Sequence, residues 1–174
     1  MSARVGIGYD SHRFAEGRPL VLGGVEVPGA ERGLAGWSDA DALTHAVIDA
    51  LLGAAGLGDI GARYPDTDER WRGSDSIALL ADTAAAVAGA GLAVVNVDAT
   101  LVCEAPRLGP HRDAMRARLA AALAAPPERV GVKFTTNEGM GFVGRGEGVA
   151  AIAVAALEPA GIAPRPARVG PPSI

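Results

Sequence analysis

Residues 38–56 read SDADALTHAVIDALLGAAG, and this stretch decides the expected fold. Ser38, followed three residues later by Asp41, is typical of a helix start, and Gly56 is typical of a helix end. Between them, residues 42–55 carry apolar side chains at helical spacing, which predicts a helix. The segments on both sides of this helix read as strands and further helices.

Residues 4–10, RVGIGYD, place apolar side chains at alternate positions, which predicts a strand. Further predicted strands lie at 92–102, 129–136 and 148–157, further helices at 74–90 and 110–124, and a hairpin at 19–27 around Gly23 and Gly24. The alanines of 148–157 equally permit a helix. This alternation predicts an α/β or α+β fold in which helices pack on one face of a mixed sheet.

Two other stretches are rich in residues that interrupt regular structure. Residues 58–73 are rich in Gly, Asp and Pro, which predicts a long loop of the kind that often carries function. Residues 158–174 carry five prolines, which exclude a regular strand ladder or helix. We therefore expect one domain at 1–157 and a Pro-rich tail at 158–174.

The composition narrows the class of protein. Of the 174 residues, 49% are hydrophobic and 21% charged, which excludes an intrinsically disordered chain. A net charge of −4 argues against binding to nucleic acid or to an anionic membrane. Cys103 is the only cysteine, so no internal disulfide forms, and the sequence has neither a leader pattern nor a long apolar run. These features predict a cytoplasmic protein.

Three side chains form a candidate metal site. Asp10 and His12 lie two residues apart on a predicted strand, so both point to the same side. His45 lies on the predicted helix, four residues from both Asp41 and Asp49, and we expect a carboxylate such as Asp41 to orient its ring. One carboxylate and two imidazoles suit an open zinc site. The spacing alone equally fits a packed or surface histidine.

A second candidate lies in a glycine-rich segment. Thr135, Thr136 and Glu138 precede the run 139–148, which reads GMGFVGRGEG. Backbone amides of glycines can approach phosphate closely, Arg145 could pair with a phosphate, and Glu138 could hold a hard cation. A strained turn between two strands is the alternative. The segment 104–107 fits either a ligand-gripping loop or an ordinary connection between a strand and a helix.

Together, three segments resemble the 2-C-methyl-D-erythritol 2,4-cyclodiphosphate synthase family in order and spacing. They are GIGYDSHRF from Gly6, SDADALTHAVIDALLGAAGLGDIGARYPDTD from Ser38, and KFTTNEGMGFVGRGEG from Lys133. The resemblance covers about residues 4–157. It implies a homotrimeric lyase of the non-mevalonate isoprenoid pathway, with active sites between subunits. The implied substrate is 4-diphosphocytidyl-2-C-methyl-D-erythritol 2-phosphate, which cyclises and releases CMP.

The resemblance also implies roles for individual residues. It assigns Zn2+ to Asp10, His12 and His45, Mg2+ or Mn2+ to Glu138, and catalytic roles to Thr136 and Glu138. The substrate-binding residues that it implies are Ser38, Asp59, Gly61, Asp66, Cys103, Ala105, Pro106, Arg107, Leu108, Thr135, Thr136, Phe142 and Arg145. Among these, Asp59 and Gly61 would contact ribose. The cytosine pocket would be lined by Cys103, Ala105, Pro106, Arg107 and Leu108. Arg145 and Glu147 are implied to lie near the trimer axis.

The sequence departs from the family pattern at two positions. Trp37 stands where many members carry His, and an indole cannot accept a hydrogen bond; we expect its ring to cover the methylerythritol part of the substrate. Arg107 stands where Lys is common, which keeps the charge but presents a planar fork. Two other functions fit the same residues: a trimeric zinc protein that binds diphosphates without turnover, which Trp37 favours, and a zinc-dependent phosphohydrolase.

Overall fold

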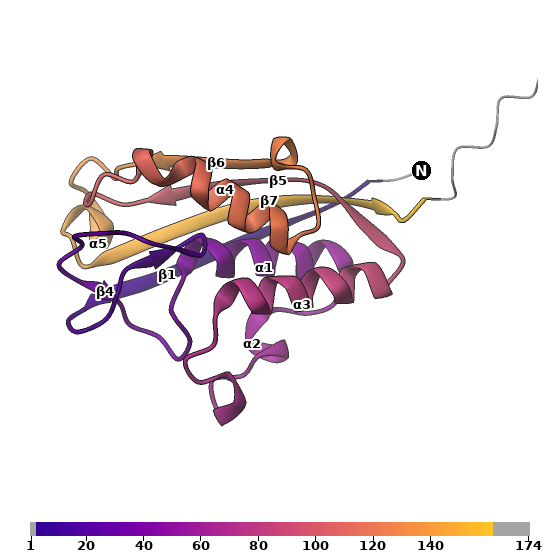
Figure 1. The fold of residues 1–174 in the computed structure, drawn as a ribbon, viewed down its shortest axis with the longest axis horizontal. Helices are drawn as coiled ribbons and strands as arrows, with labels where there is room; N and C mark the ends of the chain where they lie inside the picture. Colours follow the sequence, from indigo (N-terminus) through magenta and orange to yellow (C-terminus); the bar gives the residue numbers. More distant parts are fainter. Residues whose placement is uncertain (1–2, 162–174) are drawn as a thin grey trace, which may run out of the picture.

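A five-stranded mixed sheet forms the frame of the computed structural model, which describes residues 3–161 (Figure 1). The strand order is β4-β1-β7-β5-β6, in which β5 and β6 run parallel and the other neighbours run antiparallel. The strands are β1 (Arg4–Ala15), β4 (Gly33–Leu34), β5 (Leu92–Val102), β6 (Val130–Thr135) and β7 (Gly148–Pro159). The predicted mixed sheet is confirmed, and 148–157 belongs to a strand.

Three longer helices pack on one face of this sheet. They are α1 (Ala42–Ala55), α3 (Ser76–Gly89) and α4 (Arg112–Ala122), close to the predicted bounds. The smaller elements are α2 (Ile60–Arg63), α5 (Gly141–Gly144), the 3-10 turns η1 (Glu69–Trp71), η2 (Gly109–His111) and η3 (Pro127–Arg129), and the hairpin β2 (Val21–Leu22) and β3 (Val25–Glu26). The predicted loop at 58–73 therefore contains α2 and η1, which are too short to show a periodic pattern. Among the described residues, no helix has the length and apolarity needed to cross a bilayer.

Helix α1 lies directly on β1, where two glycines allow an unusually close approach. A Cβ added at Gly8 would lie 1.9 Å from the Ala46 carbonyl oxygen, and one added at Gly6 would lie 2.1 Å from that of Ala50. Larger side chains at these positions would therefore push the helix off the strand. Most of α1 is buried, because the sheet covers one side and α3 packs against another.

Asp41 fixes the start of α1. Its buried carboxylate accepts hydrogen bonds from the Thr44 amide at 3.0 Å and from the Thr44 hydroxyl at 2.7 Å. It also accepts from the amides of Gly23 at 2.8 Å and Gly24 at 2.7 Å, in the turn of the β2–β3 hairpin. Burial raises the pKa of Asp41, although these four donors oppose the effect. Asp41 thus joins the hairpin to the helix.

Two predicted boundaries were wrong. Strand β1 continues past Asp10 to Ala15, because its pairing with β7 runs on to Arg13 and β4 then pairs with its last residues. Strand β7 ends at Pro159 rather than before the predicted tail, and Pro159 lies opposite Leu92. A proline is tolerated there because it is the terminal residue of the strand. The remainder of the tail prediction, from residue 162 on, lies outside the described residues.

The face of the sheet that points away from the helices is open and apolar. Strands β1 and β7 expose on it Val5, Ile7, Tyr9, Ile152 and Val154, with exposed fractions from 40% to 70%. These residues alternate with the ones that face the helices, as strand geometry requires. Exposed apolar patches of this kind are typical of interaction surfaces, of ligand-binding grooves and of aggregation-prone faces.

We expect Gly8→Ala to destabilise the fold, because its methyl group would collide with the Ala46 carbonyl at the α1–β1 contact. The expected loss is about 1–3 kcal/mol of the free energy of unfolding, measured by urea denaturation. Gly53→Ala is the matched control, because no atom lies within 4 Å of its added Cβ and alanine favours a helix. Equal stability of Gly8→Ala and Gly53→Ala would contradict the role of this contact.

Candidate metal and phosphate site

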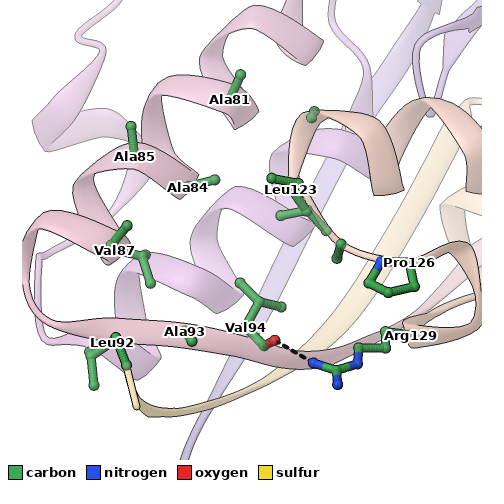
Figure 2. A pocket seen from close by; sticks show the side chains of 15 residues that line it. Ala81, Ala84, Ala85, Val87, Leu92, Ala93, Val94, Leu123, Pro126 and Arg129 are labelled. Atoms are coloured by element: carbon green, nitrogen blue, oxygen red, sulfur yellow. Dashed lines mark hydrogen bonds between the residues drawn. The ribbon is translucent and has the colours of Figure 1, made fainter. Parts of the chain in front are cut away.

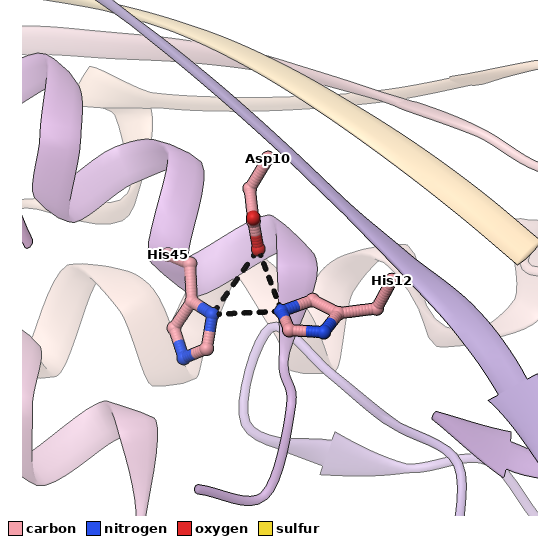
Figure 3. Close-up of side chains that lie close together, drawn as sticks. All are labelled: Asp10, His12 and His45. Atoms are coloured by element: carbon pink, nitrogen blue, oxygen red, sulfur yellow. Dashed lines mark hydrogen bonds and ion pairs between the residues drawn. The ribbon is translucent and has the colours of Figure 1, made fainter. Parts of the chain in front are cut away.

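Asp10, His12 and His45 come together beside the sheet (Figure 3). Asp10 Oδ2 lies 2.9 Å from His12 Nε2 and 3.1 Å from His45 Nδ1, and the two imidazole nitrogens lie 3.2 Å apart. Strand alternation turns Asp10 and His12 toward the helical side, and the first turn of α1 brings His45 to them. The predicted cluster of these three side chains is therefore present and is a possible metal site.

The hydrogen bonds around the triad leave its inner atoms without donors. His12 Nδ1 lies 2.7 Å from the Ala35 carbonyl oxygen, so this nitrogen carries the proton and Nε2 presents a lone pair to Asp10 and His45. A carboxylate oxygen and imidazole lone pairs that face one another repel unless a proton or a cation lies between them. This donor set, two nitrogens and one oxygen, suits a divalent metal ion.

Asp10 and His12 shift each other's pKa. Burial opposes ionisation of Asp10, but the neighbouring His12 and His45 side chains lower its pKa well below the ordinary range. Burial likewise opposes the charged form of His12, but the nearby Asp10 carboxylate raises its pKa. A metal ion at this site would compete with protons for the histidine nitrogens, as expected for histidine ligands.

The carboxylates on α1 do not orient His45, contrary to the sequence prediction. Asp41 is used at the helix start, and Asp49 Oδ1 accepts from the Ile60 amide at 2.8 Å, which holds α2. The second nitrogen of His45, Nε2, instead contacts the hydroxyls of Ser76 at 2.8 Å and Ser38 at 3.2 Å. Ser76 lies on α3, so helical spacing gave no signal for this contact.

The triad opens into a hollow of about 390 Å³. Of the residues named in the sequence analysis, it is lined by Asp10, His12, Trp37, Ser38, His45, Gly61 and Asp66. The Trp37 indole donates to the Asp68 carbonyl oxygen at 3.3 Å, and the Arg72 guanidinium lies 5.1 Å from the centre of its ring. Trp37 thus holds the segment that contains η1 beside the hollow. Asp59 is exposed and caps α2 by accepting from the Ala62 amide at 2.7 Å.

A second hollow, of about 620 Å³, gathers most of the residues that the resemblance assigns to cytidine. It is lined by Cys103, Pro106, Arg107, Leu108, Thr135 and Thr136, together with Glu104, Arg112 and Phe134 among others. Ala105 lines a neighbouring hollow with Pro106 instead. Burial raises the pKa of the Cys103 thiol to about 11, so this cysteine is an unreactive wall residue. The two hollows have no lining residue in common.

The loop before α5 is held by Glu104, whose role the sequence did not indicate. Glu104 Oε1 accepts from the amides of Asn137 at 2.8 Å and Gly139 at 3.3 Å. Between them, Glu138 adopts a positive φ of 51°, and its carboxylate accepts from the Thr136 hydroxyl at 2.7 Å. Glu138 is exposed and therefore free to meet a ligand or cation.

The remaining predicted residues lie near α5. Phe142 belongs to this short helix and is 37% exposed, and Arg145 follows its end. Arg145 Nε lies 2.6 Å from Glu147 Oε1 in an exposed ion pair. The contacts that the resemblance assigns to substrate at these positions stay predictions.

A further hollow of about 540 Å³ lies between α3, the start of β5 and the segment after α4 (Figure 2). Its lining is almost entirely alanine, valine, leucine and proline. Arg129 is the only charged residue in this lining, and its guanidinium points to the Val94 carbonyl oxygen at 3.5 Å. This hollow lacks the groups that phosphate chemistry requires, so the candidate site is the one beside the triad.

The chain is similar to known proteins over most of its length. A bifunctional enzyme IspD/IspF of Anaeromyxobacter sp. is 61% identical over 153 residues, covering 88% of this chain and 39% of that enzyme. A 2-C-methyl-D-erythritol 2,4-cyclodiphosphate synthase of Salinibacter ruber is 59% identical over 157 residues, covering 90% of this chain and 99% of the relative. The chain thus spans less than half of the bifunctional relative but nearly the whole of the single-function one.

A solved structure of 2C-methyl-D-erythritol-2,4-cyclodiphosphate synthase, described as a CDP-bound form, is also similar. It superposes with a TM-score of 0.81 at 42% identity and covers 89% of this chain and 100% of that one. The model of the YgbB family matches residues 3–158, which is almost the entire described part of the chain. The chain therefore belongs to the YgbB family.

Proposed function

We propose that this chain converts 4-diphosphocytidyl-2-C-methyl-D-erythritol 2-phosphate into 2-C-methyl-D-erythritol 2,4-cyclodiphosphate and CMP. It is then a phosphorus–oxygen lyase of the non-mevalonate isoprenoid pathway. The observation that carries the proposal is the cluster of Asp10, His12 and His45 at an open hollow, in a chain similar over nearly its whole length to enzymes of that name. A cytoplasmic location belongs to the same proposal, because a single cysteine suits a reducing compartment.

The proposed reaction needs no nucleophile from the protein. An oxygen of the substrate's 2-phosphate forms a bond to the β-phosphorus, and the bond from that phosphorus to the bridging oxygen breaks as CMP leaves. Because the reaction is intramolecular, the protein must chiefly fold the substrate into an in-line geometry. The side chains that line the two hollows would hold the two ends of the substrate.

Asp10, His12 and His45 would hold zinc, and Glu138, an oxygen ligand, would hold Mg2+ or Mn2+. When bound, these ions supply positive charge to the phosphate oxygens among which negative charge shifts. Ser38 Oγ accepts from the Ala40 amide at 3.1 Å, so its own proton is available to a phosphate oxygen. The Thr136 hydroxyl donates to Glu138 and would keep its carboxylate in position.

We further propose that the active form is a homotrimer. In it, the hollow beside the triad of one subunit would meet the second hollow, which contains Arg107, of the next subunit. Two observations support it. First, the triad and the residues that the resemblance assigns to cytosine line separate hollows within one chain. Second, the open face of the sheet exposes the side chains of Val5, Ile7, Tyr9, Ile152 and Val154. Arg145 and Glu147 would then lie near the threefold axis. The catalytic unit would be the single domain at 1–157.

Phosphorus NMR of the protein with this substrate and Mg2+ tests the proposed reaction. We expect equimolar CMP and cyclic diphosphate, and no product after removal of metal ions by a chelator. An acyclic product would identify a phosphohydrolase instead. Binding without any product would identify a protein that holds the diphosphate without turning it over, and either result would contradict the proposal.

Metal analysis of two variants separates the two proposed ions. His45→Ala should remove the zinc that copurifies with the chain and abolish turnover, because an imidazole ligand is lost. Glu138→Gln should keep zinc but lower kcat by about a hundredfold or more, because charge neutralisation at the leaving phosphate is lost. Glu128→Gln, at an exposed position in η3, is the control that should retain both properties. Loss of zinc from Glu138→Gln would refute the assignment of a separate ion to Glu138.

Sedimentation tests the proposed trimer. The wild-type chain should sediment with about three times the mass of one chain at micromolar concentration. Ile7→Asp should yield monomers, because it places a charge in the middle of the open apolar face. Leu57→Asp introduces the same charge at an exposed leucine after α1 and should leave the trimer intact. A wild-type monomer would contradict the proposed assembly.

A further inference from the structure

Ser76 connects His45 to a carboxylate outside the metal triad. Ser76 is fully buried at the first position of α3, and its hydroxyl lies 2.8 Å from His45 Nε2. The same hydroxyl donates a short hydrogen bond to Asp39 Oδ1, while Asp39 Oδ2 accepts from the Ser76 amide at 3.0 Å. Asp39 thus accepts two hydrogen bonds from Ser76, one from its hydroxyl and one from its amide.

The direction of the hydrogen bonds that link Asp39, Ser76 and His45 follows from the number of protons that each group can donate. The Ser76 hydroxyl donates its single proton to Asp39 Oδ1. Toward His45, the hydroxyl oxygen can then act only as an acceptor, and Nε2 must carry the proton. His45 Nδ1 is therefore unprotonated, and its lone pair points at Asp10 Oδ2, 3.1 Å away.

Ser38 does not provide the same control over His45. Its hydroxyl is farther from His45 Nε2, at 3.2 Å, and it accepts from the Ala40 amide. No carboxylate contact fixes the direction of its own proton in the described structure. Ser38 can therefore accept from His45 or turn toward a ligand, whereas Ser76 can only accept.

We propose that Asp39 and Ser76 are positioning residues that hold His45 in the tautomer and ring orientation required to bind the catalytic metal ion. The proposal rests on the proposed function only in taking Asp10, His12 and His45 as the metal ligands. The pair fixes His45 as the Ala35 carbonyl fixes His12, so both rings direct a lone pair to one point. Partners of this kind strengthen metal binding about 10–100-fold.

The structure offers a control that separates positioning from helix capping. Asp39 and Asp75 each accept an amide hydrogen bond from the first turn of α3, Asp39 from Ser76 and Asp75 from Ile77 at 2.9 Å. Only Asp39 also accepts from the Ser76 hydroxyl. A change at Asp75 therefore disturbs the start of α3 but leaves the contact between Ser76 and His45 in place.

The test compares Ser76→Ala, Asp39→Asn and Asp75→Asn with the wild type in the absence of substrate. Zinc affinity is measured by competition with a chelating dye, and the visible spectrum of the Co2+-loaded protein reports the ligand geometry. We expect Ser76→Ala and Asp39→Asn each to bind zinc about 10–100-fold more weakly and to change the Co2+ spectrum. Asp75→Asn should match the wild type in both measurements, and thermal unfolding of the metal-free variants confirms that each is folded.

Two results would overturn the proposal. One is wild-type zinc affinity together with an unchanged Co2+ spectrum in Ser76→Ala or in Asp39→Asn. The other is an equal loss in Asp75→Asn and Asp39→Asn, which would assign the effect to the start of α3. Neither measurement uses substrate. If the variants show these effects while the wild-type protein makes no cyclic product, the proposed function is refuted and this inference stands.

Discussion

The contact between α1 and β1 is the constraint on which the site depends. Gly6 and Gly8 let the helix backbone approach the strand so closely that a methyl group at either position would collide with a carbonyl oxygen. The contact fixes the position of α1 along β1 and brings His45 within 3.2 Å of both Asp10 and His12. Ligand atoms of a metal site must be placed to within a fraction of an ångström, which a rigid helix-on-strand contact can supply and a mobile loop cannot.

Around this contact, three carboxylates have the same structural role. Asp41, Asp49 and Glu104 each accept backbone amides of other segments and thereby hold the hairpin, α2 and the loop of Glu138. These carboxylates hold the segments around the site without contacting the triad through hydrogen bonds. At the centre, the inner atoms of the triad are acceptors that face one another, which is unfavourable until a proton or a cation joins them. The same arrangement therefore favours the binding of a metal ion.

The sequence predicted the parts of this arrangement that follow from local patterns. Helical periodicity located 42–55, alternation placed Asp10 and His12 on one side, and the glycine pair marked the hairpin. Contacts between distant segments could not be found in this way. Because Asp41 lies four residues before His45, the sequence predicted that its carboxylate orients the His45 ring. In the structure that carboxylate instead accepts hydrogen bonds from the amides of Gly23 and Gly24.

The true neighbours of His45 come from elsewhere in the chain. Ser76 lies 31 residues away from it, and Ser76 and Asp39 are separated by 37 residues, so no periodic pattern relates them. Likewise, the alanines of 148–157 fit a strand or a helix until pairing with β1 and β5 decides between them. Such pairings depend on the complete fold, not on the local sequence.

The most direct measurement of this account is the anomalous diffraction of crystals grown with zinc. The account predicts one strong peak, about 2.0–2.2 Å from Asp10 Oδ2, His12 Nε2 and His45 Nδ1, with a fourth position open to the hollow. It would be contradicted if zinc bound elsewhere or if the ring of His45 turned its Nδ1 away from the ion.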